Sequence, residues 1–169
     1  LASYAERKPE DPAGPLWLGR CLERQGKLVE ARRAYRQAQE RDLSRTMVLV
    51  DEQVEPTRIV GYHTLLMAQV KQEEIPGDRP RIKRAIPVIL LGQLGIGREF
   101  QGRGYGELML MDAQARVDEI SRKTGVRAMM LDARNERLAL WYERYDFIRF
   151  PDQFRMFKNI DAIRALKLI

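Results

Sequence analysis

The apolar residues of the chain follow two spacings, one typical of strands and one typical of helices. Residues 46–50 and 58–70 are rich in β-branched and aromatic side chains, which predicts a short strand and a longer one. Turn-forming polar residues at 51–57 separate them, and a loop is expected at 71–85. Pro87 then opens a run of Val, Ile and Leu, which predicts a buried strand.

Helices and strands alternate in the second half of the chain. From Tyr105 to about Lys123, Leu110, Ala113 and Val117 recur at helical spacing, and Gly125 ends the predicted helix. The pattern then predicts a strand at 127–132, a helix at 136–145, strands at 147–150 and 154–158, and a terminal helix at 161–169. This alternation indicates a mixed α/β or α+β sheet.

The first 43 residues have a different character. Prolines punctuate residues 1–15, and helical spacing then predicts two helices separated by Gly26. The resulting helical hairpin, at 12–43, has small and apolar residues at the offsets expected of a known repeat: Leu18, Gly19, Leu22, Gly26, Leu28, Ala31, Tyr35 and Ala38. On these residues it resembles a tetratricopeptide repeat. A single repeat cannot bury its own apolar face, so the hairpin is expected either to pack on the rest of the chain or to belong to a larger array. We therefore divide the chain into a helical hairpin at 1–43 and a second domain at 44–169.

Composition and net charge restrict the partners and the metal sites that can be expected of the chain. The 169 residues carry a net charge of +6 and a pI of about 9.7, which makes a polyanion such as nucleic acid a candidate partner. No apolar run approaches the ~20 residues of a membrane helix, and no signal peptide opens the chain, so we expect a soluble, cytoplasmic protein without membrane contact. With one cysteine, Cys21, and one histidine, His63, no Cys/His metal cluster is possible, and we expect no metal.

A glycine-rich segment joins the buried strand at residue 87 to the helix at Tyr105. Half of the chain's 12 glycines lie between residues 92 and 106. Such a turn directs backbone N–H groups toward one point before a helix N-terminus, where an anion such as phosphate is favoured. Glu107 stands where a dinucleotide fingerprint needs its third glycine, and no Gly-Lys-Ser/Thr ending marks a P-loop. The plainer alternative is a tight turn whose glycines only permit helix–strand packing.

Two separated motifs give the segment a closer identity. The pattern Gln101-x-x-Gly104-x-Gly106 after a strand, followed by Asn135-x-x-x-Ala139-x-x-Tyr142-Glu143-x-x-x-Phe147, resembles the GNAT N-acetyltransferase superfamily. The superfamily commonly has glycine where this chain has Asp146. The resemblance implies an α+β, three-layer fold: a mixed, mostly antiparallel sheet flanked by helices, here with the N-terminal helical hairpin added.

From about Ala31 onward the chain looks more narrowly like the GNAT toxins of bacterial toxin–antitoxin pairs. Three stretches carry this resemblance: residues 43–46 before a strand, a basic loop leading into residues 86–88, and Leu-Gly-Gln-Leu at 91–94. In that strand Gln93 replaces an arginine often found in relatives. The resemblance implies acetylation of the amino acid on charged tRNA, inhibition of translation, a small DNA-binding antitoxin as partner, and a homodimer in some relatives.

The resemblance also assigns site residues. Acetyl-CoA would be held along its pantetheine arm by residues 94–96 and at its pyrophosphate by the glycine turn, and the complete set is Leu94, Gly95, Ile96, Gln101, Gly102, Arg103, Gly104, Tyr105, Gly106 and Asn135. Tyr142 would be the acid that protonates the leaving thiolate. Against this, Tyr142 lies on an apolar helical stripe, where a tyrosine is more often part of the core.

Two other sets of residues are weaker candidates for a functional role. The basic loop residues Arg79, Arg81, Lys83 and Arg84 are candidates for contacting tRNA phosphates, and the alternative is a solvated loop. Asp132 and Glu136 are weak candidates for a general base. A missing base suits an α-amine, which titrates near 8, better than a lysine, which titrates near 10.4.

Two other functions stay open at this point. The chain could be an ordinary GNAT enzyme that acetylates a small amine or a protein. It could also be a non-catalytic module in which the repeat-like hairpin binds a partner and the acetyltransferase part is degenerate.

Overall fold

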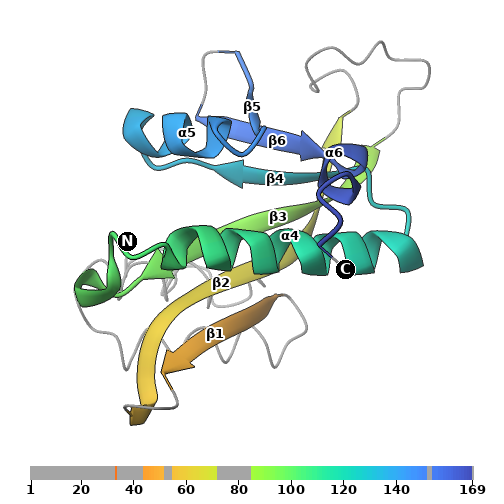
Figure 1. The fold of residues 1–169 in the computed structure, drawn as a ribbon. Coiled ribbons are helices and arrows are strands. Elements are labelled where there is room, and N and C mark those ends of the chain that lie inside the picture. The colour runs from red at the N-terminus through yellow and green to blue at the C-terminus, as the bar shows by residue number, and fades with distance from the viewer. Residues whose placement is uncertain (1–32, 34–43, 52–54, 72–84, 152–153, 169) are drawn as a thin grey trace, which may run out of the picture. The chain divides into compact units, whose positions relative to one another are not determined.

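The computed structural model describes residues 33, 44–51, 55–71, 85–151 and 154–168 (Figure 1). The chain divides into two compact units, Leu1–Thr46 and Met47–Ile169, and nearly all of the described residues belong to the second. The predicted hairpin at 1–43 lies outside the described residues apart from Arg33, and so does the basic loop with Arg79, Arg81, Lys83 and Arg84.

A six-stranded mixed sheet forms the centre of the second unit, in the order β1-β2-β3-β4-β6-β5. The pair β3–β4 is parallel, while β2–β3, β4–β6 and β5–β6 are antiparallel. The elements are β1 (Arg45–Asp51), β2 (Glu55–Lys71), β3 (Ala85–Ile96), η2 (Arg98–Phe100), α4 (Tyr105–Lys123), β4 (Ala128–Asp132), α5 (Glu136–Glu143), β5 (Ile148–Arg149), β6 (Arg155–Asn159) and α6 (Ile160–Arg164). The predicted mixed, mostly antiparallel sheet with flanking helices is confirmed.

Several predicted boundaries were wrong. Strand β2 begins at Glu55, inside the expected turn, because a proline at the start of a strand is tolerated where its missing N–H is not required. Helix α5 ends at Glu143, since Asp146 adopts a left-handed conformation with φ of 62°. Helix α6 covers only Ile160–Arg164 and is followed by Lys167 at φ of 50°.

Helices α4, α5 and α6 share one hydrophobic cluster with one face of the sheet (Figure 1). Leu110, Ala113 and Val117 of α4 are completely buried against strand residues such as Leu91 and Met129. Burying a Leu or Val side chain contributes about 1.5–3 kcal/mol to the stability of the fold. The amphipathic pattern of α4 is therefore sufficient to explain why this helix packs on the sheet. The opposite face has its own cluster, which includes Val88, Met130 and Phe157.

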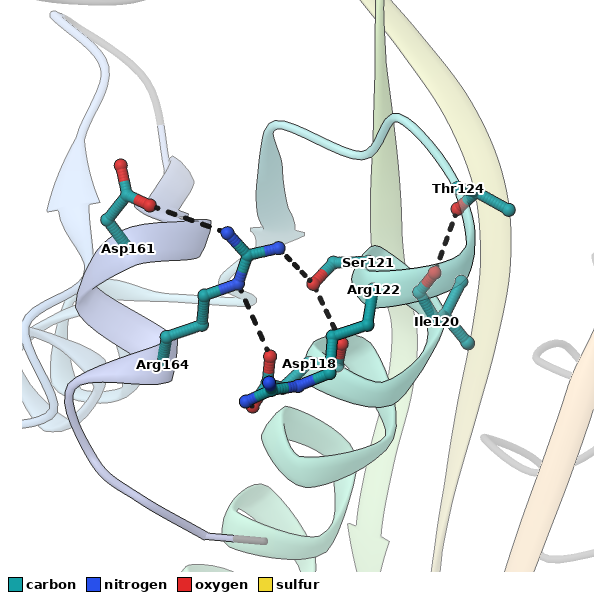
Figure 2. Close-up of polar contacts among 7 residues, drawn as sticks. All are labelled: Asp118, Ile120, Ser121, Arg122, Thr124, Asp161 and Arg164. Carbon is teal, nitrogen blue, oxygen red and sulfur yellow. Dashed lines mark hydrogen bonds and ion pairs between the residues drawn. The ribbon is translucent and has the colours of Figure 1, made fainter.

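A polar network fixes α6 to the end of α4 (Figure 2). Asp118 is 2% exposed and accepts a hydrogen bond from Arg122 Nη2 at 2.9 Å. Arg164 of α6 reaches the other Asp118 oxygen at 3.5 Å through Nε and donates to Ser121 Oγ at 3.1 Å through Nη2. A buried carboxylate needs such cations, because an unpaired buried charge is strongly destabilising. The network therefore ties α6 to the C-terminal part of α4.

Within the part of the chain that the structure describes, no helix has both the length and the apolar character needed to cross a membrane.

Candidate active site

The sheet opens between β3 and β4. These strands pair only at residues 88–91 with residues 128–131, yet β3 continues to Ile96 while β4 ends at Asp132. The β3–β4 pairing therefore does not extend to residues 93–96 of β3. A strand edge of this kind can pair with an extended ligand through main-chain groups.

A β-bulge marks the start of the opening. Thr64 of β2 lies opposite Gln93, whereas its neighbour Leu65 lies opposite Leu91, so Gly92 is an extra residue in β3. A bulge bends the strand and redirects the side chains beyond it, and bulges are common next to active sites. Here it coincides with the end of the β3–β4 pairing at residue 91.

The glycine turn at 101–106 is open and its amides are available. Gly102 and Gly104 have φ of 75° and 85°, and a Cβ placed on either would meet no atom within 4 Å. Among the described residues, none accepts a hydrogen bond from the amides of residues 102–106. Gly104 is the N-cap of α4, so these donors lie at the positive end of a 19-residue helix. The turn has the features of a phosphate site.

Short contacts fix the turn and the end of β3. Gln101 Nε2 donates to the Ile96 carbonyl of β3 at 3.1 Å, and Gly97 N donates to the Val60 carbonyl of β2 at 2.9 Å. A Cβ on Gly106 would be 3.8 Å from Trp141 and 4.0 Å from Ile96. Gly106 thus lies where the turn, β3 and α5 meet, and this brings the two sequence motifs together.

Tyr142 projects from α5 into the core beside this junction. Its ring makes edge contacts with Trp141 at 4.8 Å and with Phe147 at 5.7 Å between centroids. Burial raises the pKa of the Tyr142 hydroxyl to about 12, so the phenol is protonated at physiological pH. The phenol therefore carries a proton that a general acid could donate.

The ends of α5 are fixed by polar contacts. Asn135 is the N-cap, and its side-chain oxygen accepts from Leu138 N at 3.0 Å. At the other end, buried Lys158 donates from Nζ to the Tyr145 carbonyl at 2.8 Å and lies 3.7 Å from the Asp146 carboxylate. Asp146 therefore fills the glycine position of the motif in a left-handed conformation and places its charge beside a buried ammonium.

Both candidate general bases are held in ion pairs. Asp132 accepts from Arg155 Nε at 2.8 Å across the β4–β6 pair. Glu136 accepts two hydrogen bonds from Arg149, at 2.9 and 3.0 Å, and these lower the pKa of its carboxyl. The lowered pKa makes the Glu136 carboxyl a weaker proton acceptor, and both residues stay weak candidates for the base.

A second buried polar group is His63 of β2, which contacts Asp112 of α4. His63 is inaccessible to solvent, and its Nε2 lies 2.6 Å from Asp112 Oδ2, which also accepts from Arg116 Nε at 2.8 Å. Burial lowers the pKa of His63 despite the neighbouring Asp112 carboxylate. Burial alone would raise the pKa of Asp112, but the hydrogen bonds from Arg116 and His63 outweigh it, and the net shift is downward. Neutral His63 therefore donates from Nε2, which leaves Nδ1 buried without a partner.

The structure brings together the turn at 101–106, residues 94–96 and Tyr142. It gives Gln101 and Asn135 structural hydrogen bonds that the motifs did not predict. No sequence signal indicated Tyr62, whose ring lies 2.8 Å from where a Gly95 Cβ would be. Gly95 is thus required for the packing of Tyr62.

Comparison with known proteins gives three results. No family model matches the chain. The tRNA-acetylating toxin of Mycobacterium tuberculosis (strain ATCC 25618 / H37Rv) is 34% identical over 111 residues, which are 64% of this chain and 67% of the toxin. A crystal structure of KacT with a tyrosine-to-phenylalanine substitution superposes with a TM-score of 0.70 at 25% identity, covering 78% of this chain and 79% of that one.

Two further structures share the fold. A KacTA–DNA complex matches with a TM-score of 0.65 at 25% identity over 78% of both chains. AtaT complexed with acetyl-methionyl-tRNAfMet matches with a TM-score of 0.69 at 24% identity, over 78% of this chain and 79% of that chain. The split sheet, the open glycine turn and the identity to the curated relative agree, and the chain belongs to the tRNA-acetylating toxin family of GNAT N-acetyltransferases.

Proposed function

We propose that the protein transfers the acetyl group of acetyl-CoA to the α-amine of an aminoacyl-tRNA and thereby inhibits translation. The observation that carries this proposal is the open turn at 102–106, with unpaired amides at a helix N-terminus beside the buried phenol of Tyr142. The likeness to a tRNA-acetylating toxin supports tRNA as the carrier of the acceptor amine.

The turn and strand β3 divide the binding of acetyl-CoA between them. The amides of Gly102, Arg103, Gly104, Tyr105 and Gly106 suit the two negative phosphates, because charge-assisted hydrogen bonds at a helix N-terminus need no opposing cation. The free edge of β3 at Leu94, Gly95 and Ile96 suits the amide groups of the pantetheine arm. Gln101 supports the turn, and the side-chain nitrogen of Asn135 remains available for a ligand.

Acetyl transfer from a thioester requires the protein mainly to position the amine against the thioester carbonyl. The amine attacks the thioester carbonyl, a C–N bond forms, and the C–S bond breaks when the tetrahedral species collapses. Tyr142 gives its proton to the departing sulfur, and the proton lost by the attacking nitrogen restores the phenol through solvent. The burial that weakens the phenol as an acid also raises the pKa of a thiol beside it, which reduces the mismatch between the two groups.

The state of the carboxylates favours an α-amine acceptor. Because Asp132 and Glu136 are paired with arginines, neither is poised to remove a proton from a lysine-like amine. An α-amine titrates near 8, and deprotonating it at neutral pH costs roughly 3 kcal/mol less than deprotonating a lysine. Aminoacyl-tRNA presents such an amine.

The remaining partners follow from the same assignment. Arg79, Arg81, Lys83 and Arg84 would contact tRNA phosphates, and neutralising them would then weaken the salt dependence of binding. A small DNA-binding antitoxin would hold the toxin inactive, in line with the likeness to the KacTA–DNA complex. A substrate made and used in translation places the protein in the cytoplasm, and a homodimer is compatible with this role.

Transfer of radiolabelled acetyl from acetyl-CoA to a panel of aminoacyl-tRNAs tests the proposal. We expect product on at least one charged tRNA and none on the same tRNA after deacylation. Turnover on small amines or proteins, with none on any charged tRNA, would reassign the enzyme to the ordinary GNAT class. Failure to bind acetyl-CoA in calorimetry would reject an enzymatic role.

A further inference from the structure

Gln93 carries a side-chain amide with no partner. Both its Nε2 and its Oε1 are buried, and neither has a hydrogen-bond partner among the residues that the structure describes. The residue lies in β3 directly after the bulge at Gly92 and opposite Thr64 of β2.

An orphaned amide of this kind is unfavourable in the folded protein. Each buried polar atom that leaves water without a new partner weakens folding, whereas an apolar side chain of the same shape would do so much less. Folding alone gives no reason for glutamine at this position. Such a group is expected where a ligand supplies the missing partners.

The position of Gln93 puts it at the opening of the sheet. It belongs to residues 93–96 of β3, to which the pairing with β4 does not extend. Leu94 packs toward the cluster that contains Tyr142, so strand alternation directs Gln93 to the opposite face. On that face the Tyr62 ring lies against Gly95, one strand repeat further along. A thioester held at this edge would have Tyr142 on one side and Gln93 on the other.

We propose that Gln93 binds the aminoacyl group of the acceptor. This inference rests on the proposed function. An aminoacyl ester presents a carbonyl oxygen that only accepts and an α-amine that donates an N–H, and the two are separated by one carbon. Gln93 matches this pair, because Nε2 donates to the ester carbonyl and Oε1 accepts from the amine. The amine lone pair is then free to face the thioester, on the side opposite the proton donor.

The test replaces Gln93 by methionine, which keeps the length and removes both polar atoms. Gln114→Met is the matched control: Gln114 is also fully buried with an unpaired Oε1, but it lies in the interior of α4. For each variant we would measure the melting temperature, the acetyl-CoA affinity, and kcat and KM for aminoacyl-tRNA. A simple primary amine without an ester carbonyl serves as the second acceptor.

We expect Gln93→Met to melt no lower than the wild type and to bind acetyl-CoA equally well. Its kcat/KM for aminoacyl-tRNA should fall about 10- to 100-fold, as expected for two lost hydrogen bonds, with little change for the simple amine. Gln114→Met should leave transfer unchanged. Gln93→Ala gives the same test if the methionine is poorly accommodated.

The outcomes separate this inference from the proposed function. Full activity of Gln93→Met on aminoacyl-tRNA would overturn the role of Gln93 and leave the proposed function intact. Equal losses for both acceptors would also overturn it, since they would show a general defect. A wild-type enzyme that ignores every charged tRNA would remove the proposed function itself.

Discussion

Replacing Gly104 by alanine tests whether the turn amides hold the coenzyme diphosphate. Gly104 has φ of 85°, and an added Cβ would meet no protein atom within 4 Å. The cost to folding is therefore the left-handed backbone alone, roughly 1–2 kcal/mol. For a chain of this size that corresponds to roughly 2–8 °C in melting temperature. No steric rearrangement of the protein is expected.

The cost to binding should be larger, because the new methyl group projects into the open space in front of the turn. A turn that relaxes out of the left-handed conformation also directs its amides away from the ligand. Losing one hydrogen bond to a charged group costs about 1.5–3 kcal/mol. The Kd for acetyl-CoA should then rise roughly 10- to 150-fold.

Calorimetry with acetyl-CoA and a thermal melt of the free protein measure the two effects separately. Gly125→Ala is the matched control, since Gly125 is also surrounded by open space but has an ordinary φ. Acetyl-pantetheine, which lacks the diphosphate, should be used equally well by Gly104→Ala and the wild type. An unchanged Kd for acetyl-CoA, with the expected drop in melting temperature, would refute the assignment of the diphosphate to this turn.

Three further predictions concern the residues around the site. Tyr142→Phe should lower kcat with little change in KM, and because the pKa of Tyr142 is about 12, the wild-type rate should show no loss from phenol ionisation between about pH 7 and pH 10 in a pH–rate profile. Because the folded-state pKa of His63 is below 6.5, its contribution to stability is complete above that value and is lost as pH falls below it; denaturant melts should show this slope, and His63→Gln should abolish it. Arg164→Met should speed hydrogen exchange in α6 and lower stability by about 1 kcal/mol, since it leaves Asp118 with one cation fewer; unchanged exchange in α6 would mean that the network does not secure it.

Most of the second domain could be predicted from the sequence, because its signals are local. The spacing of Leu110, Ala113 and Val117 defined α4, and the apolar run after Pro87 defined β3. Boundaries failed where tertiary contacts decide them. The end of α5 depends on Asp146 in a left-handed turn and on Lys158, which comes from a strand later in the chain.

The candidate site was predictable only where a motif marks it. The glycines at 102 and 104 report a backbone conformation directly, so the turn could be recognised. The packing of Tyr62 on Gly95 and the bulge at Gly92 depend on which residue of β2 faces which residue of β3. That register results from long-range pairing, which one sequence does not display. The partnerless amide of Gln93 becomes visible only once that pairing is known.

The narrow pairing of β3 with β4 has a consequence for the unfolding of the protein. The two halves of the sheet, β1-β2-β3 and β4-β6-β5, are joined by the short parallel pairing of residues 88–91 with residues 128–131. The helices that share the hydrophobic cluster also connect the two halves. A pantetheine arm bound along residues 94–96 would extend the contacts between these two halves and hold them together. At a concentration of 100 times its Kd, such a ligand adds about 2.7 kcal/mol to stability. On the proposed function, the lifetime of the free toxin would then depend on the acetyl-CoA level of the cell, and starvation for that metabolite would loosen the enzyme as well as deprive it of substrate.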